Sequence, residues 1–194
     1  NFFLHAAAVT LVFYLFKTLK FPPFTALAAS LIYAVHPVFV NAVAWLVGRN
    51  DTLVTVFVLT SFIFFIKYIN EKKFFFLILH LIFYLFAILS KEVSLSLPFL
   101  LVLFYFLAEN KKILSRQIIA VAAGWLILIT LWYLMRSAAF EDAWCKTSVK
   151  PEYFITNIAT IPEFISKFFL PVNLSVLPVF KPLHTIAGIV LAGG

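Results

Sequence analysis

The apolar run over residues 74–108 constrains this chain more than any other feature, because it is too long to be one membrane helix. As a single helix it would measure roughly 52 Å at ~1.5 Å per residue, whereas the hydrocarbon core of a bilayer is about 30 Å thick. Its only charged residues are Lys91 and Glu92, directly after Ser90. We therefore expect the run to fold back at Ser90-Lys91-Glu92 and form two membrane spans.

The composition places the rest of the chain in the same class. Of the 194 residues, 64% are hydrophobic and 12% are charged, and this charged share is about half that of a soluble domain. The pattern of apolar and charged segments predicts an all-α, polytopic integral membrane helix bundle with about six spans. The expected spans are residues 2–16, 22–35, 52–69, 74–89, 93–108 and 117–135.

After the last of these spans, the sequence predicts a polar outer loop over residues 137–156 and an amphipathic helix over about 157–170. The apolar positions of this helix recur at helical spacing: Ile158, Ile161, Ile165, Phe168 and Val172. Such a helix is typical of the membrane interface, and a tilted span is the alternative. A further span would start within residues 184–194. We interpret residues 1–194 as a single transmembrane domain, truncated at both ends.

The basic residues predict how the bundle is oriented. One face of the membrane receives Lys17, Lys20, Lys67, Lys72, Lys73, Lys111, Lys112 and Arg116, and the other receives Arg49, Lys91, Arg136, Lys146 and Lys150. The positive-inside rule makes the first face cytoplasmic. The second is then periplasmic in a bacterial inner membrane, or lumenal in the endoplasmic reticulum of a eukaryote. No basic run is longer than two residues, so the net charge of +7 does not indicate nucleic-acid binding.

Charged residues from three different turns fall at the outer ends of predicted spans: Arg49, Asp51, Lys91, Glu92 and Arg136. An ionised side chain costs about 2.5–3.5 kcal/mol at the bilayer centre and less near the interface. One interpretation is that these residues are helix-end anchors whose side chains reach the headgroups. The other is that they form a binding site.

The binding interpretation follows from the chemistry of the basic groups. Arginine holds a phosphate with two parallel hydrogen bonds, and lysine holds it as a point charge. At this depth a phosphate is carried by a lipid. Arg49, Lys91 and Arg136 are therefore the candidate phosphate ligands, and Asp51 and Glu92 are candidates to hold them in place.

The histidines and the cysteine carry less information. His36 precedes Pro37, and either caps a helix end or shapes the turn beside the charged residues. His5 and His80 lie in apolar stretches, where we expect interhelical hydrogen bonds. The single cysteine, Cys145, excludes a disulfide within these residues. No cluster has metal-ligand spacing, so we predict no metal site and no cofactor, and leave a divalent metal open.

Three motifs together resemble a known family. They are HPVFVNAVAWLVGRND (residues 36–51), LSKEVSLSLP (89–98) and FFLPVNLSV (168–176). They are similar to the membrane part of the transmembrane TPR-containing O-mannosyltransferase-like proteins, which belong to the GT-C superfamily of glycosyltransferases that use polyprenyl-phosphate sugars. The matching residues are His36, Pro37, Ala42, Val43, Ala44, Gly48, Arg49, Asp51, Ser90, Lys91, Glu92, Pro171, Asn173, Leu174 and Ser175. Phe39, Val40 and Asn41 stand where the family commonly has His, Thr and Glu, which puts the role of that Glu in doubt here.

The resemblance implies a bundle of GT-C type that moves a sugar, with mannose as one candidate, from a polyprenyl phosphate to a hydroxyl acceptor at the outer face. The implied partners are the lipid-linked sugar, an acceptor that we expect to be an exported protein, and membrane lipids, with no nucleic acid. It also implies that the catalytic acid lies upstream of Asn1. No catalytic residue is therefore assigned, and residues 1–194 alone are expected to be inactive.

Two other functional classes stay open from the residues alone. One is a transporter or flippase for a lipid-linked anion, because charge inside a membrane often marks a transport path. Transporters usually place the site near the midplane, whereas these charges fall at one outer end. The other is a non-catalytic membrane scaffold, which paired charges without a cavity would favour.

Overall fold

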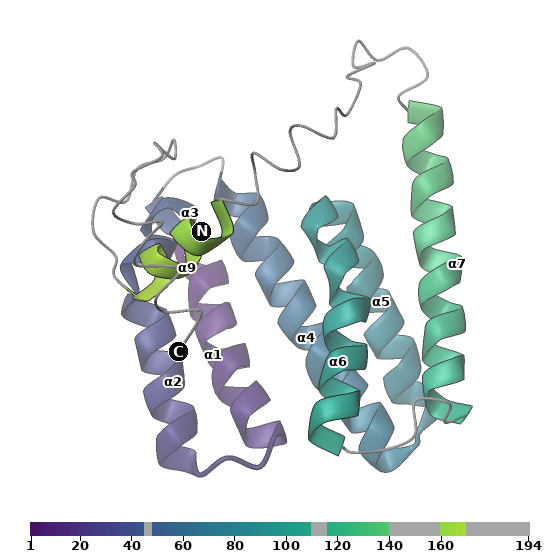
Figure 1. The fold of residues 1–194 in the computed structure, drawn as a ribbon, viewed down its shortest axis with the longest axis horizontal. Coiled ribbons are helices and arrows are strands. Elements are labelled where there is room, and N and C mark those ends of the chain that lie inside the picture. Colours follow the sequence, from purple (N-terminus) through teal and green to yellow (C-terminus); the bar gives the residue numbers. More distant parts are fainter. Residues whose placement is uncertain (45–47, 110–115, 140–159, 170–194) are drawn as a thin grey trace. The chain divides into compact units, whose positions relative to one another are not determined.

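The computed structural model describes residues 1–44, 48–109, 116–139 and 160–169 of the chain. Every regular element in these ranges is a helix (Figure 1), which confirms the all-α prediction. The helices are α1 Phe2–Thr18, α2 Pro23–Val35, η1 Pro37–Phe39, α3 Val40–Ala44, α4 Arg49–Glu71, α5 Phe74–Ser90, η3 Glu92–Ser96, α6 Leu97–Glu109, α7 Arg116–Ala139 and α9 Thr160–Phe169.

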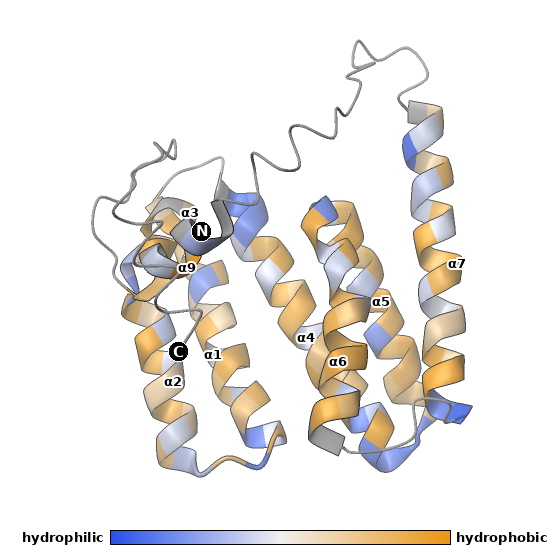
Figure 2. Ribbon diagram, viewed as in Figure 1, coloured by the Kyte–Doolittle hydropathy of each residue, from blue (hydrophilic) through white to orange (hydrophobic). Residues whose placement is uncertain are grey.

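The helices have the composition of membrane spans. α4 and α7 are each long and apolar enough to cross a membrane, and α1, α5 and the η3–α6 segment are shorter apolar helices. Figure 2 shows apolar residues along the lengths of the helices, with hydrophilic residues concentrated toward their ends. The described residues thus form part of an α-helical membrane bundle. That each shorter helix crosses the bilayer by itself stays a prediction.

Close packing divides the chain into two compact units, which are described separately. The first unit comprises residues 1–35 and 42–141 and contains α1, α2 and α4 to α7. The second unit comprises residues 36–41 and 142–194 and contains η1 and α9.

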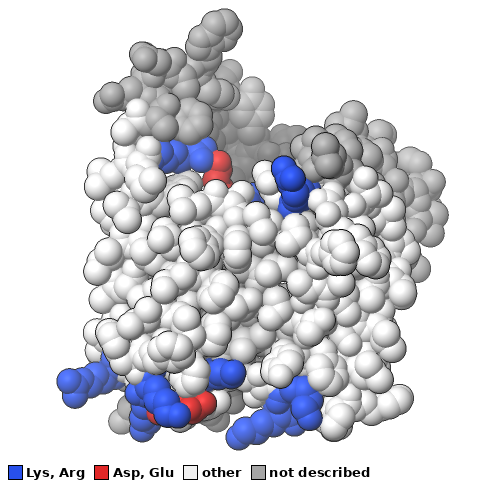
Figure 3. Space-filling model, turned by 180° about the vertical axis from the view of Figure 1, so that it is seen from behind, with Lys and Arg blue, Asp and Glu red and all other residues white. Residues whose placement is uncertain are grey.

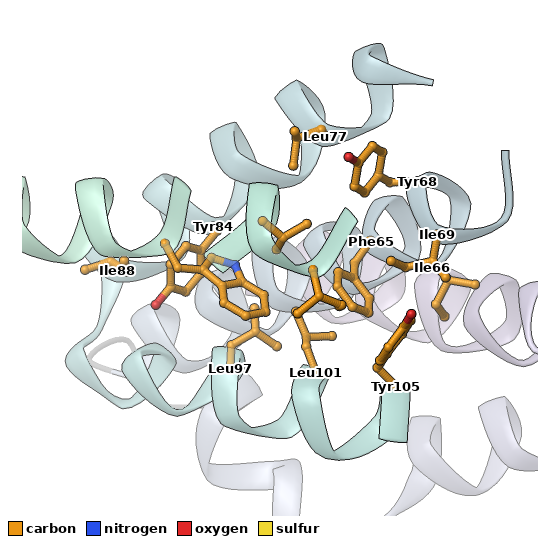
Figure 4. Close-up of a cluster of buried hydrophobic side chains, with 13 residues drawn as sticks. Phe65, Ile66, Tyr68, Ile69, Leu77, Tyr84, Ile88, Leu97, Leu101 and Tyr105 are labelled. Atoms are coloured by element: carbon orange, nitrogen blue, oxygen red, sulfur yellow. The ribbon is translucent and has the colours of Figure 1, made fainter. Parts of the chain in front are cut away.

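In the first unit, α4 packs on both α1 and α5, α1 also packs on α2, and α5 packs on α7. The core lies among α4, α5, α6 and α7 (Figure 4). Its buried members are Phe65, Ile66, Tyr68, Ile69, Leu77, Tyr84, Ile88, Leu97, Leu101, Tyr105, Ile118, Val121 and Trp125. Lys and Arg side chains gather at the two ends of the helices, and the surface between them on the face drawn in Figure 3 is uncharged.

The turn at the C-terminal end of α5 is where the sequence predicts it. α5 ends at Ser90, and Lys91 has an extended backbone (φ −160°, ψ 137°). The chain then enters the short η3 and continues directly into α6. The long apolar run therefore folds back at Ser90-Lys91-Glu92, as its length requires.

Several helix ends differ from the ranges expected from the sequence, and two of them bear on the charged residues. α4 begins at Arg49 rather than at residue 52, so Asp51 lies in its first turn. There the positive end of the helix dipole favours a carboxylate. α7 continues through Ala139, past the residue where the outer loop was expected to begin. The rest of that loop, including Cys145, and the segment 184–194 lie outside the described residues.

Both histidines in apolar stretches make interhelical contacts, as predicted. His5 Nε2 lies 3.1 Å from the carbonyl oxygen of Ala34, which joins α1 to α2. His80 on α5 is fully buried and bonds to residues on α4 and α7.

In the second unit, α9 occupies most of the range expected for an amphipathic helix. His36 caps η1, because its Nδ1 accepts a hydrogen bond from the Val38 backbone N–H at 3.3 Å. Its Nε2 lies 2.9 Å from the carbonyl oxygen of Phe168 near the end of α9. Nε2 therefore carries the proton, and of the two alternatives for His36 the structure shows the cap. That α9 lies in the membrane interface stays a prediction.

Candidate functional site

Two ion pairs join three helix ends at one end of the first unit. Lys91 Nζ pairs with Asp51 Oδ1 at the start of α4. Arg136 Nη1 pairs with Glu92 Oε1, which ties the last part of α7 to the start of η3. Four of the five charged residues that the sequence places at this level are thus brought together in pairs.

The conformation of Lys91 explains why adjacent residues reach different helices. Successive side chains of an extended segment point to opposite sides. Lys91 and Glu92 accordingly turn away from each other, one toward α4 and the other toward α7. The Lys91 carbonyl accepts hydrogen bonds from the backbone N–H of Ser94 at 3.2 Å and from its hydroxyl at 2.8 Å. These bonds fix the turn locally.

The second pair borders a cavity of about 440 Å³ between this turn and α7. The cavity is lined by Ile88, Leu89, Ser90, Lys91, Glu92, Val93, Trp132 and Arg136. It therefore offers two cations, a carboxylate and a hydroxyl next to an aromatic ring. Such a lining suits a ligand that combines an anion with other polar groups.

Trp132 is a member of this site that the sequence analysis did not single out. The guanidinium of Arg136 lies over its ring, with Cζ 5.2 Å from the ring centroid. A cation–π contact of this kind contributes about 0.5–1 kcal/mol at an exposed position. The sequence signal for this contact was the four-residue separation of Trp132 and Arg136, because residues four apart on a helix are neighbours on its surface. The contact limits the directions in which the Arg136 fork can point.

The charges of the cluster remain accessible. Side-chain exposure is 46% for Lys91 and 47% for Asp51, and 39% for Arg136 and 59% for Glu92. Half-exposed pairs typically stabilise a fold by only about 0–1 kcal/mol. Their stabilising effect is therefore small, and a ligand can approach both cations from the cavity side.

The structure does not bring Arg49 and His36 into this cluster. Arg49 is exposed in the first turn of α4, and within the described ranges its guanidinium forms no ion pair. His36 belongs to the second unit. Their predicted roles beside the cluster stay predictions. Across the described parts of the chain, no three His, Cys, Asp or Glu side chains gather in a way that could hold a metal ion.

Comparison with known proteins assigns the chain to a family. The family model described as dolichyl-phosphate-mannose-protein mannosyltransferase matches residues 1–135. The chain belongs to this family. The match includes Arg49, Asp51, Lys91 and Glu92 and ends one residue before Arg136.

A curated member of the mannosyltransferase group is also similar. Protein O-mannosyl-transferase Tmtc1 of Drosophila melanogaster is 35% identical over 96 residues, which cover 50% of this chain but only 11% of that protein. No solved structure matches the chain. The resemblance to TPR-containing O-mannosyltransferase-like proteins with membrane helices is confirmed. The third motif, residues 168–176, lies beyond the residues that the family model matches.

Proposed function

We propose that this chain is part of a membrane mannosyltransferase that takes mannose from a polyprenyl phosphate and transfers it to a hydroxyl group of a protein. The observation that carries the proposal is the cavity at the α5–η3 turn, where Lys91 and Arg136 face the same space. The family description and the name of the Drosophila relative both specify mannosyl transfer, which supports this sugar.

The basic residues would act on the leaving group. In the reaction, a base removes the proton of the acceptor hydroxyl as its oxygen attacks the anomeric carbon. The bond from that carbon to the phosphate oxygen breaks, and the lipid phosphate leaves with increased negative charge. Lys91 and Arg136 would stabilise this charge by preorganised electrostatics. Asp51 and Glu92 would hold the two cations in place. None of the described residues is assigned as the base.

A second cavity supports a lipid as the carrier of the phosphate. It measures about 230 Å³ and is lined by Val54, Thr55, Val58, Leu59, Val93, Ser94, Ser96, Leu97 and Leu100. The lining is apolar apart from hydroxyl side chains. Val93 lines both cavities, so the charged space and the apolar space adjoin. A polyprenyl phosphate would place its head in the first and the start of its chain in the second.

The other functional classes fit these features less well. A transporter usually holds its substrate near the membrane midplane, whereas both ion pairs lie at helix ends. A scaffold needs no cavity beside its charges, and here Lys91, Glu92 and Arg136 line one.

A transfer assay with the full-length protein tests the proposed function. We expect radiolabelled mannose to move from a polyprenyl phosphate to protein and not from a nucleotide sugar. Lys73→Ala, a control at the opposite end of α5, should transfer at the parental rate. If the protein instead moves the intact lipid-linked sugar between the leaflets of a vesicle without transfer, the transporter class is favoured. If it does neither, the proposal is wrong.

The orientation of the site is tested by labelling Cys145. The distribution of basic residues along the sequence predicts that this residue lies on the periplasmic or lumenal face. We expect a membrane-impermeant maleimide to label Cys145 from that face in sealed membranes, with any other cysteine of the full-length protein replaced by serine. If a reactive Cys145 is labelled only from the cytoplasmic side, the orientation is reversed and the proposed site faces the cytoplasm.

A further inference from the structure

Three buried polar side chains link α4, α5 and α7 far from the charged cluster. Ser61 and His80 are fully buried, and Trp125 is 4% exposed. Trp125 Nε1 lies 2.9 Å from His80 Nε2. On the other side of the ring, His80 Nδ1 lies 3.0 Å from the Ser61 carbonyl oxygen and 2.8 Å from its hydroxyl. The three residues thus form a continuous hydrogen-bonded chain across three helices.

The direction of these hydrogen bonds is fixed by the donors. An indole N–H can only donate, so His80 Nε2 accepts and the ring proton is on Nδ1. Nδ1–H then donates to Ser61, while the Ser61 hydroxyl lies 3.1 Å from the His80 carbonyl, to which it donates. Hydrogen bonds between Ser61 and His80 therefore run in both directions between α4 and α5. His80 Nε2 is left to accept from Trp125 on α7. A hydrogen-bond donor at the position of Trp125 is needed to complete the chain.

This chain and the ion pair of Arg136 contact α7 at two separate levels. Trp125 and Arg136 on α7 are separated by about three helical turns, or ~17 Å, and their partners are His80 within α5 and Glu92, two residues beyond the end of α5. Trp132 lies between Trp125 and Arg136 on the same stripe of α7, because positions seven and eleven residues apart share a helix face. Two separate contacts thus define both the height and the rotation of α7 against α5.

The packing beside the hydrogen-bonded residues Ser61, His80 and Trp125 leaves little room for α7 to move toward α5. A Cβ atom added at Gly124, next to Trp125, would lie 2.7 Å from Cδ1 of Leu81, which follows His80. The helices therefore approach closely at the level of the hydrogen-bonded chain. The ion pair between Glu92 and Arg136 is half exposed and weak by itself, so the buried chain is the stronger constraint on α7.

We propose that Ser61, His80 and Trp125 are positioning residues, which set the register of α7 so that Arg136, held over the ring of Trp132, meets the phosphate of the bound lipid. This inference rests on the proposed function in that it takes a lipid phosphate as the ligand of Arg136. Trp125 and Arg136 are too far apart to touch the same ligand group. Trp125 acts on binding only through the position of α7.

A double-mutant cycle in the full-length protein tests this route, with dolichyl monophosphate as the probe. Trp125→Phe keeps a ring but removes the N–H donor, and is expected to weaken binding by roughly three- to tenfold. Residues this far apart normally act additively. We expect instead no further loss when Trp125→Phe is added to Arg136→Ala. Additive losses would overturn the inference.

A second readout needs no ligand. In protein labelled with 5-fluorotryptophan, the ¹⁹F resonance of Trp132, assigned with Trp132→Phe, should shift in Trp125→Phe and in Ser61→Ala. Tyr84→Phe is a matched control, since Tyr84 is a buried α5 residue that stacks on His80, and its hydroxyl has no hydrogen-bond partner among the described residues. It should leave the resonance unchanged. An unchanged Trp132 resonance in both test variants would overturn the inference. If the parent does not bind dolichyl monophosphate, the proposed function fails, and the Trp132 resonance alone decides whether the chain positions α7.

Discussion

Replacing Arg136 with alanine is expected to weaken the binding of a polyprenyl phosphate to the full-length protein by about ten- to a hundredfold. A hydrogen bond that involves a charged group is worth roughly 1.5–3 kcal/mol, and each 1.4 kcal/mol corresponds to a factor of ten in affinity. The loss should occur in binding and not in folding. The ion pair that Arg136 forms with Glu92 is half exposed, and such a pair stabilises a fold by at most about 1 kcal/mol.

Lys73→Ala provides the matched control for this measurement. Lys73 also pairs with a carboxylate, Glu71, at 2.7 Å, but at the opposite end of α5 from the cavity. Its replacement should leave both binding and the melting temperature near those of the parent. Arg136→Lys should bind with intermediate affinity, because the charge is kept and the planar fork is lost. Parental binding by Arg136→Ala would remove Arg136 from the site.

Arg49→Ala is informative in the same assay. The sequence places Arg49 with the other two basic residues, yet within the described ranges it has no ion pair. Weakened binding would add it to the phosphate ligands. Parental binding would limit the site to Lys91 and Arg136.

The length of the apolar segments predicted the outline of the fold. The run over residues 74–108 exceeds one membrane thickness and contains a single charged break, so the turn at Ser90-Lys91-Glu92 followed directly. The rotation of α7 about its axis could not be obtained in the same way. Its apolar residues lie all round the helix, and in a membrane no apolar stripe marks the packed face. Which residues face α5 depends on contacts such as Trp125 with His80, between segments distant in sequence.

The sequence predicted that four charged residues lie at one level, but not how they pair. Charges at three helix ends indicated that Asp51, Lys91, Glu92 and Arg136 lie at one level, and the structure joins them in pairs. That Lys91 turns to α4 and Glu92 to α7 depends on the extended backbone of one residue, which the local sequence does not determine. Trp132 was not singled out, because an aromatic residue in an apolar membrane helix is usually an interface or packing residue.

Reversing the Asp51–Lys91 pair should separate its structural role from phosphate binding. In Lys91→Asp alone, two carboxylates face each other at the turn, and we expect a lower melting temperature and binding weakened by about a hundredfold or more. Adding Asp51→Lys restores an ion pair in which residue 51 carries the positive charge and residue 91 the negative charge. The fold should then recover, because the pair again joins α4 to the turn. Binding should not recover, because residue 91 lines the charged cavity and residue 51 is not among its lining residues.

The affinity of the Asp51→Lys/Lys91→Asp double variant for a polyprenyl phosphate, measured together with its melting temperature, is therefore the most direct test of the central claim that this cluster binds a lipid phosphate. The account predicts a melting temperature near that of the parent and binding that remains at least about tenfold weaker. If the double variant regains both stability and parental affinity, the cation at residue 91 serves only to hold the turn. The charges would then be helix-end anchors.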